Sequence, residues 1–209
     1  MVFSYINLLE GRKYMSVNNT ASKLISEASQ LITNAGYNGF SYADLAERLG
    51  IRKPSIHHHF PSKVDLVVAV VEQQRAAIRS QIAELESGTP DAMGHLLAYV
   101  DYWKRCIEDE SATFCLAGVL AVELPGLPPE VGAAVQRHFN DLGLWIERVM
   151  ELGIEQGAIQ LELEPKTSSQ FFQTAVYGAM VMARAYGDPG KFNLVVDAFL
   201  ARMRTDGSR

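Results

Sequence analysis

A chain of 209 residues that is 48% hydrophobic and 21% charged has the composition of a folded globular protein, which excludes a wholly disordered one. No apolar run approaches the roughly 20 residues that cross a membrane, so we expect a cytoplasmic protein without a membrane partner. Two cysteines are too few for a disulfide framework, in agreement with a reducing compartment.

The net charge of −5 is unevenly distributed along the chain. Residues 1–63 hold seven Lys or Arg against four Asp or Glu, whereas residues 64–209 hold 12 against 20. A basic segment joined to an acidic body indicates that only the N-terminal part meets a polyanion.

Apolar residues recur with helical period almost throughout, which predicts an all-α fold of about nine helices. Caps and breakers delimit the first four helices: Asn19 or Thr20 to Gly36, Ser41 with Asp44 to Gly50, Pro54 to Pro61, and Ser62 with Asp65 to Pro90. Longer helices are predicted at about residues 91–110, 113–123, 129–156, 167–186 and 189–204.

Residues 35–66 contain two short helices joined by a Gly-Ile turn, and the second opens with cations, which is the form of a helix-turn-helix. The stretch AGYNGFSYADLAERLGIRKPSIHHHFPSKVDL resembles the DNA-binding domain of the tetracycline-repressor family of bacterial regulators. The spacing of Gly36, the Gly50-Ile51 turn and the ending His58-His59-Phe60 carries this resemblance. Pro54 and His57 depart from it, since the family usually has a small residue and a tyrosine at those places.

The resemblance implies three segments. These are an N-terminal extension at residues 1–17, a DNA-binding domain at residues 18–66, and a ligand-binding and dimerisation domain at residues 67–209. We expect the extension to be flexible, and the choice between translation starts at Met1 and Met15 stays open.

The resemblance also implies which residues contact DNA. Carried over onto this sequence, it places Ser41 on a phosphate, Arg52, Lys53 and Ser55 near base edges, and His57, His58 and Lys63 on the DNA backbone. Side-chain chemistry agrees, because Arg and Lys donate to guanine and the backbone accepts hydrogen bonds from cations and N–H groups.

The run of His57, His58 and His59 raises a second hypothesis, a metal-dependent hydrolase. Consecutive residues point about 100° apart around a helix, so these rings diverge and cannot close on one ion. With the same helical geometry, we expect His57 and His58 to face DNA and His59 to face the domain interior. We therefore predict no metal site, no cofactor and no catalytic residue.

The C-terminal half is predicted to hold a largely apolar pocket for a small-molecule effector. The candidate lining consists of apolar and aromatic residues at helical spacing, two cysteines and one histidine: Leu96, Tyr99, Trp103, Cys106, Cys115, His138, Phe139, Trp145 and Tyr177. An ordinary core produces the same pattern and is the alternative for each of them.

The stretch FCLAGVLAVELPGLPPEV, which contains Cys115, is similar to a subgroup of the family in which a cysteine at the start of this helix responds to electrophiles. A helix N-terminus lowers the pKa of a thiol and favours the reactive thiolate. An electrophile-sensing or redox-sensing repressor is therefore an alternative, and a small buried apolar side chain is the other interpretation of Cys115.

The last two predicted helices have an apolar face with small residues that permit close helix approach. The predicted homodimer interface consists of Phe171, Ala175, Gly178, Ala179, Met182, Phe192, Val196 and Phe199. Two such helices from each subunit would form a four-helix bundle, and a core within one chain is the alternative. We favour the dimer because a helix-turn-helix normally reads two half-sites.

Together these features predict a homodimeric transcriptional regulator, in the role of a repressor, that leaves a palindromic operator in double-stranded DNA when an effector binds. The effector would favour a conformation whose recognition helices no longer match successive major grooves. An architectural DNA-binding protein without an effector is the third hypothesis, and the size of the acidic half argues against it.

Overall fold

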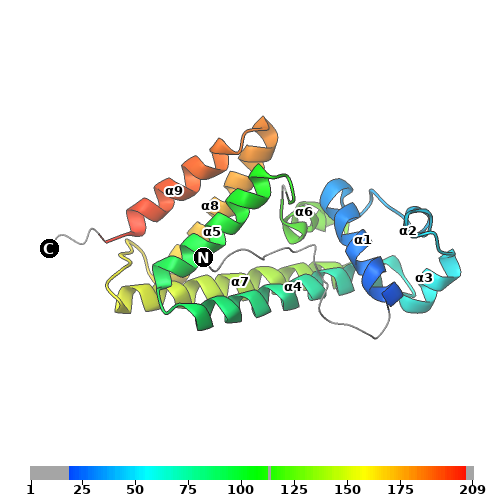
Figure 1. Cartoon of the computed structure of the whole chain (residues 1–209), viewed down its shortest axis with the longest axis horizontal. Coiled ribbons are helices and arrows are strands. Elements are labelled where there is room, and N and C mark those ends of the chain that lie inside the picture. The colour runs from blue at the N-terminus through cyan, green and yellow to red at the C-terminus, as the bar shows by residue number, and fades with distance from the viewer. Residues whose placement is uncertain (1–18, 113, 206–209) are drawn as a thin grey trace.

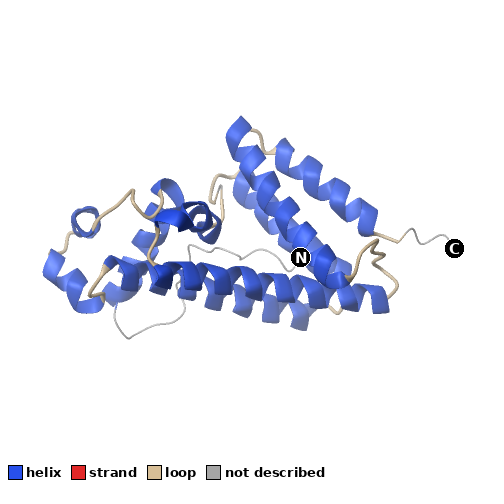
Figure 2. Cartoon of the chain, turned by 180° about the vertical axis from the view of Figure 1, so that it is seen from behind, coloured by secondary structure: helices blue, strands red, loops and turns tan. Residues whose placement is uncertain are grey.

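The computed structural model describes residues 19–112 and 114–205, and within them the chain is all-helical, as predicted (Figure 1; Figure 2). The nine α-helices of this described part are α1 (Asn19–Ala35), α2 (Tyr42–Leu49), α3 (Lys53–His59), α4 (Lys63–Gly88), α5 (Ala92–Glu108), α6 (Leu116–Glu123), α7 (Pro129–Glu155), α8 (Pro165–Tyr186) and α9 (Gly190–Met203). A 3-10 turn, η1 (Leu124–Gly126), follows α6, and an isolated bridge joins Ile159 to Arg204. The predicted N-terminal extension lies outside the described residues.

The first helices begin and end at the caps that the sequence predicts. Ser41 and Ser62 each form a capping box with the aspartate three residues later, at the starts of α2 and α4. Gly36 and Gly50 follow α1 and α2 with φ angles of 74° and 62°. Glycine adopts this left-handed region without steric cost, which explains why both helices stop there.

Three helix starts differ from the prediction. Asn19 is already the first residue of α1. α6 begins only after Cys115, because Cys115 is its N-cap and has an extended backbone with φ −69° and ψ 129°. α8 begins earlier than predicted, at Pro165, since proline supplies a helical φ and needs no N–H partner in the first turn.

Two apolar cores meet along α4. The first is formed by α1, α2, α3 and the first half of α4, and residues of α6 and of the start of α7 complete it. Its α4 members end at Val71, whereas Ile82 and Leu85 of the same helix pack against the second core. α5, α7, α8 and α9 form most of that second core. The core around α1 to α3 therefore extends beyond the segment 18–66.

The long helices α4 and α7 run side by side and connect the two ends of the molecule (Figure 1). Arg75 of α4 is 8% exposed and donates two hydrogen bonds to Asp141 of α7, at 3.1 and 2.6 Å. Glu72 of α4 accepts hydrogen bonds from Arg75 and from Arg137 of α7. Since a buried charge is costly without partners, these contacts hold the two helices in one relative position.

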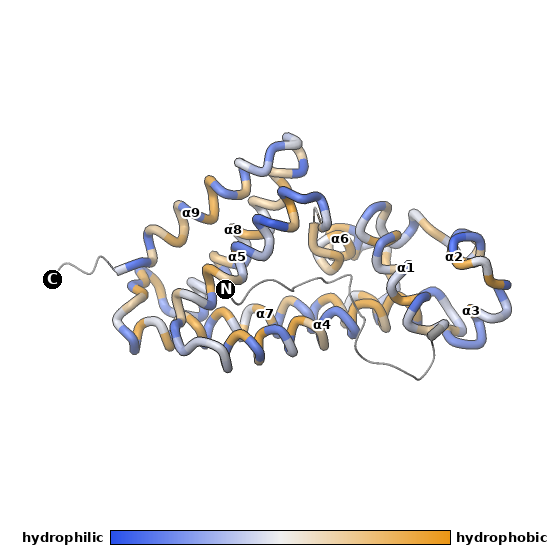
Figure 3. Tube along the Cα trace, in the orientation of Figure 1, coloured by the Kyte–Doolittle hydropathy of each residue, from blue (hydrophilic) through white to orange (hydrophobic). Residues whose placement is uncertain are grey.

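α8 and α9 pack against each other at the end of the molecule remote from α3 (Figure 1). Hydrophilic and hydrophobic segments alternate along α4, α7 and α9 in Figure 3, as expected of helices with one buried side. No helix in the described residues combines the length and the apolar content that a membrane crossing requires.

Candidate nucleic-acid interface and ligand site

α3 presents cations and histidines on its outer surface. Its seven residues are anchored by Ile56, which is fully buried, whereas Arg52, Lys53, His57 and His58 are exposed. The helix lies at the end of the molecule farthest from α9 (Figure 1). A protruding helix of this size and charge fits the major groove of DNA.

Acidic residues of the described part of the chain do not neutralise the positive charge on this surface. α3 itself contains no acidic residue, and Arg52 and Lys53 form no ion pair with any residue of the described part of the chain. Ser55, one turn further along, is half-buried, and its amide donates to the Arg52 carbonyl oxygen at 2.9 Å. Both cations are therefore available to a polyanion.

Tyr42 of α2 supports the end of α3. Its hydroxyl donates to the Phe60 carbonyl oxygen at 2.9 Å, and burial together with the charge of Asp65 raises the pKa of Tyr42 to about 12. Its ring meets the His57 imidazole edge-on, with the ring centroids 4.9 Å apart. His57 Nδ1 lies 3.1 Å from the Pro61 carbonyl oxygen, so the neutral ring that donates there has only an acceptor at Nε2. His57 can therefore donate to a phosphate through Nε2 only after it takes up a proton.

Ser41 and Lys63, both predicted to lie on the DNA backbone, already have partners within the chain. The Ser41 hydroxyl donates to Asp44 at 2.8 Å in the capping box. The Lys63 ammonium donates to the Phe40 carbonyl oxygen and lies over the rings of Tyr37 and Phe40, 4.6 and 4.2 Å from their centroids. Burial lowers the pKa of Lys63. Lys63 is thus not a free cation, although its ammonium keeps further N–H donors for a phosphate, whereas the Ser41 hydroxyl must give up its bond to Asp44 to donate to one.

The three consecutive histidines have separate surroundings. The rings of His58 and His59 meet edge-on with centroids 5.4 Å apart, and His59 is half-buried where His58 is exposed. In the described residues, no group of three or more His, Cys, Asp or Glu is arranged to hold a metal ion.

Cys115, His138 and Tyr177 meet in a buried polar cluster where α6, α7 and α8 come together. The Tyr177 hydroxyl donates to the Cys115 sulfur at 3.3 Å, and His138 Nε2 lies 3.7 Å from the same sulfur. Burial raises the pKa of the Cys115 thiol, but hydrogen bonds from His138 and Tyr177 and the charge that His138 can carry lower it below its ordinary value overall. Burial raises the pKa of Tyr177, so its hydroxyl keeps the proton that it donates.

The other predicted pocket residues belong mainly to the second core. Leu96, Trp103 and Cys106 are buried there, and Phe139 lies half-buried against the Tyr177 ring. The Tyr99 hydroxyl and the Trp103 indole N–H are buried without a hydrogen-bond partner among the described residues. Buried polar groups without a partner are uncommon in folded proteins, and these two could form hydrogen bonds with the polar atoms of a ligand.

A pocket of about 300 Å³ opens between α4 and α7. α4 contributes Arg75, Ile78, Arg79, Ile82, Ala83 and Glu86. α7 contributes His138, Asp141, Leu142, Leu144, Trp145 and Arg148. Only His138 and Trp145 of the predicted pocket residues line it. The α4 wall was missed because its arginines and isoleucines have the pattern of an ordinary amphipathic helix.

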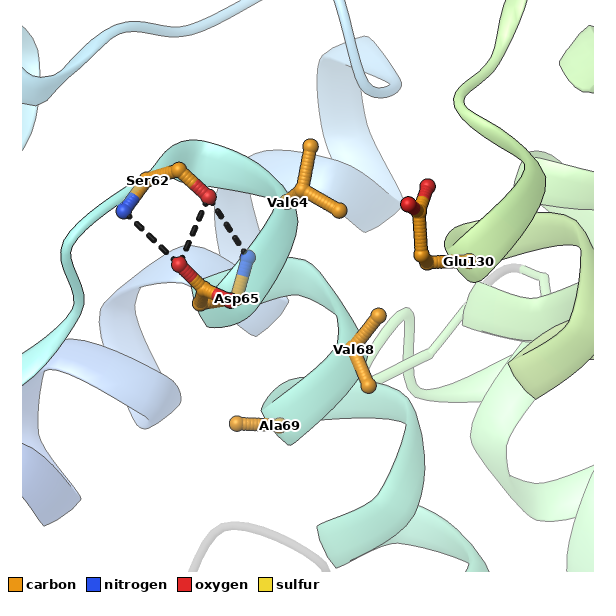
Figure 4. Close-up of a pocket in the computed structure, with 6 residues that line it drawn as sticks. All are labelled: Ser62, Val64, Asp65, Val68, Ala69 and Glu130. Atoms are coloured by element: carbon orange, nitrogen blue, oxygen red, sulfur yellow. Dashed lines mark hydrogen bonds between the residues drawn. The ribbon is translucent and has the colours of Figure 1, made fainter.

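A second hollow, of about 500 Å³, lies at the start of α4 (Figure 4). Its charged lining is acidic, from Asp65 of α4 and Glu130 of α7, beside the apolar Val64 and Val68. The Ser62 amide and hydroxyl both donate to Asp65 within the capping box. An acidic hollow whose donors are already paired repels a polyanion, so it is not part of the nucleic-acid interface.

Part of the predicted dimer interface lies on an exposed apolar surface. Phe171 and Met182 of α8 are 57% and 43% exposed, and Gly178 between them is exposed as well. Ala175 and Phe199 are half-buried. An apolar patch of this kind on a helix commonly marks an interaction surface.

The other predicted interface residues are not exposed in the single chain. Ala179, Phe192 and Val196 are buried in the chain's own core, because they lie on the sides of α8 and α9 that face the chain's interior. Val181 and Leu194, which lie outside the predicted set, are 50% and 70% exposed on these helices. Apolar residues occur on both sides of each helix, so periodicity alone could not separate the inner face from the outer one.

A cationic helix carried on two supporting helices and joined to a larger helical half defines a helix-turn-helix regulator of transcription. The family description "Bacterial regulatory proteins, tetR family" matches residues 24–70, and "Tetracyclin repressor-like, C-terminal domain" matches residues 92–199. The chain belongs to the tetR family of bacterial regulatory proteins.

Known relatives extend over most of the chain. A crystal structure of a TetR-family transcriptional regulator from Agrobacterium tumefaciens has 42% identity and a TM-score of 0.86, covering 88% of this chain and 97% of that one. The HTH-type transcriptional repressor NemR of Escherichia coli K12 is 24% identical over 169 residues, which are 80% of this chain and 85% of NemR. The crystal structure of E. coli NemR in its reduced form has the same fold, with a TM-score of 0.81 at 22% identity over 90% of this chain and 100% of that one.

Proposed function

We propose that the protein is a repressor of transcription that binds a palindromic operator as a homodimer in the cytoplasm and leaves it when a small-molecule effector binds. The observation that carries this proposal is α3, whose exposed cations and histidines are held outward by the buried Ile56. The relative NemR is named a transcriptional repressor, which supports this direction of control.

Arg52 and Lys53 are the proposed readers of base sequence. They stand at the start of α3, are exposed, and can donate to the O6 and N7 atoms of guanine in the major groove. Ser55 is the third candidate, since a hydroxyl can serve as donor or acceptor to several bases.

His57 and His58 are the proposed phosphate ligands at the other end of α3. The Nδ1 contact with the Pro61 carbonyl oxygen holds the His57 ring in place at this end of the helix, where both histidines are exposed. Ser41 and Lys63 complete the proposed backbone contacts, Ser41 at the cost of its hydrogen bond to Asp44 and Lys63 through its remaining N–H donors.

The dimer is proposed to form through the outer faces of α8 and α9. Phe171, Gly178, Val181 and Met182 on α8 and Leu194 on α9 form an exposed apolar set there. Burial of this set between two subunits removes apolar area from water, and a two-fold axis supplies two copies of α3 for two half-sites.

Operator binding tests the proposal directly. Selection from a pool of randomised duplexes with the full chain should yield a palindrome, and fluorescence anisotropy should show binding that weakens steeply with salt. Arg52→Ala should weaken binding of the selected duplex by about 1–3 kcal/mol and relax its preference at one base pair. Lys166→Ala, an exposed cation on α8, is the matched control. Absence of any duplex binding at low salt would sink the proposal.

A second candidate is an electrophile-sensing repressor that acts through Cys115. The observation in its favour is the pair of polar contacts from His138 and Tyr177, which stabilise the thiolate. Methylglyoxal or a quinone should then release the wild-type protein from its operator and leave Cys115→Ser bound. Cys106→Ser, the other buried cysteine, is the control, and equal release of all three proteins would exclude this candidate.

A further inference from the structure

The pocket between α4 and α7 has an apolar wall. Ile78 and Ile82 of α4 and Leu142 and Trp145 of α7 form it, and Leu144 at its rim is 56% exposed. A volume of about 300 Å³ lies at the lower end of the range of small-molecule sites. An apolar body that displaces water from this wall gains stability.

The carboxylates of the pocket already have partners. Asp141 accepts two hydrogen bonds from Arg75, and Glu86 accepts one from the Trp145 indole N–H at 3.1 Å. These acids are therefore committed to groups of the protein, and Arg75 is committed to Asp141 and Glu72. Glu86 keeps its charge, but the arginines of the lining, Arg75, Arg79 and Arg148, outnumber its carboxylates, so the pocket favours an anion over a cation.

Two arginines on opposite walls remain without a close acidic partner. The Arg79 side chain is 60% exposed, and its Nη1 lies 4.0 Å from Asp141, at the outer limit of an ion pair. Arg148 forms no ion pair with the described residues, and its one hydrogen bond, to the Leu144 carbonyl oxygen, is 3.4 Å long. Guanidinium groups bind carboxylates through paired N–H donors.

We propose that the pocket between α4 and α7 binds a small organic anion with an apolar body, whose charge pairs with Arg79 and Arg148 and whose body lies against Trp145 and Leu142. If this pocket is the effector site, the effector is an organic anion. That role of the pocket rests on the proposed function.

A ligand in this pocket touches the groups that connect the two halves of the chain. His138 in its wall contacts Cys115 of α6 and Tyr177 of α8, and the contacts of Arg75 with Asp141 hold α4 against α7. α4 also forms part of the core that positions α3. An anion bound between α4 and α7 favours the spacing of these helices at which both arginines reach it, and a change in that spacing moves α3.

The probe for the test is 2-naphthoate, with the uncharged 2-naphthamide as its matched control. Binding to DNA-free protein is measured by calorimetry and by the fluorescence of Trp145 in a Trp103→Phe background. Naphthoate should bind saturably with one site per chain, and naphthamide about tenfold more weakly, as expected for loss of a charged hydrogen bond.

Variants locate the site. Arg79→Gln with Arg148→Gln should weaken naphthoate binding by about tenfold and leave naphthamide unchanged. Ala83→Trp, which fills the pocket, should weaken both probes. Arg105→Gln with Arg202→Gln removes two exposed arginines outside the pocket and should change neither.

Equal naphthoate binding by the wild type and the Arg79→Gln, Arg148→Gln variant overturns the proposal, as does the absence of saturable binding by the wild type. Because the measurement needs no DNA, failure of operator binding would remove the proposed function and leave this site standing. Release of the operator by naphthoate from the wild type, and not from the variant, supports the effector role. Saturable binding that releases no operator supports the site and removes that role.

Discussion

Arg75 is the one buried cation among the described residues, and its two carboxylate partners come from different helices. A guanidinium with so little exposure is stable only where charged acceptors replace its water. Glu72 accepts hydrogen bonds from Arg75 of its own helix and from Arg137 of α7, so α4 is joined to α7 at two points, Glu72 with Arg137 and Arg75 with Asp141. The ionisation state of Glu72 therefore affects the contact with Arg137 directly and the partner set of Arg75 as well.

Acid is expected to loosen this contact through Glu72. Burial alone would raise the pKa of Glu72, but hydrogen bonds and charges from Arg137 and Arg75 lower it below its ordinary value of 4.5. An acid whose folded-state pKa is depressed contributes stability above its unfolded value, and this contribution is lost as pH falls below 4.5 and through the folded pKa. Thermal unfolding followed by circular dichroism should show that Glu72→Gln lowers the melting temperature at neutral pH and converges with the wild type in acid.

Glu84→Gln provides the comparison for that experiment, because Glu84 is an exposed acid on the same helix. Its melting curve should follow the wild type at every pH. Parallel pH profiles for Glu72→Gln and the wild type would contradict the role given to Glu72.

Among the elements, α6 contacts both halves of the chain through its two ends. Cys115 at its start lies in the second core, and Glu123 at its end accepts a hydrogen bond from the Tyr37 amide at 2.7 Å, just beyond α1. The same carboxylate covers Gly36, where an added Cβ would lie 2.1 Å from Glu123 Oε1. α6 thus connects the second core directly to the residues that follow α1.

Gly36→Ala is expected to disturb this connection in two separable ways. Its left-handed φ of 74° imposes a strain of about 1–2 kcal/mol on alanine, and the new Cβ displaces Glu123 from Tyr37, which costs about 1 kcal/mol more. In a Glu123→Ala background only the strain remains, so the double variant should be about 1 kcal/mol more stable than the sum of the singles predicts. Chemical denaturation of the four proteins measures the cycle.

Gly50→Ala is the matched control for Gly36→Ala. Gly50 has a φ of 62° and no heavy atom within 4 Å of an added Cβ, so only the strain applies. A cost at Gly36 no greater than the cost at Gly50 would show that Glu123 contributes nothing.

If the chain dimerises as proposed, Phe171→Asp on α8 should convert the proposed dimer into a monomer. Its side chain is 57% exposed in the single chain, and a charge there would be buried without a partner in the proposed interface. Size-exclusion chromatography with light scattering measures the mass, and Val122→Asp, at a 77% exposed position on α6, is the control. An unchanged mass for Phe171→Asp would place the interface elsewhere.

Element boundaries were predictable where local chemistry decides them. Neighbouring residues alone determine the capping boxes at Ser41 and Ser62 and the left-handed backbone of Gly36 and Gly50. The structure confirms all four. The inner and outer faces of α8 and α9 were not predictable, because tertiary packing selects which apolar stripe is buried. The pocket was missed for a related reason: its arginines come from α4 and α7, which only the fold brings together.

At the scale of the whole molecule, the N-terminal and C-terminal halves are not joined by a linker. Residues of the C-terminal half form part of the N-terminal core. Leu116 and Leu120 of α6 and Val131 of α7 belong to the same core as α1, α2 and α3. Leu120 is fully buried in that core. Part of the stability of the helix-turn-helix unit therefore comes from residues of α6 and α7, which follow it much later in the sequence.

A fragment of residues 19–88 should lack a cooperative unfolding transition, because it loses every α6 and α7 contribution to its core. In the full chain, Leu120→Ala should lower the free energy of unfolding by about 2–5 kcal/mol, the usual cost of a cavity at a buried leucine. Leu163→Ala, at a 51% exposed position, should have little effect. A sharp thermal transition of the fragment in circular dichroism would show that the unit folds alone.

The shared core also limits how such a protein can change over evolutionary time. A substitution that enlarges Val131 or Leu116 presses on α1 and α4, so it is tolerated only together with a compensating change in the helix-turn-helix unit. Binding specificity for a new operator and for a new effector would then be inherited as a matched pair. Chimeras that exchange the DNA-binding unit between relatives should retain stability only when α6 and the start of α7 are exchanged with it.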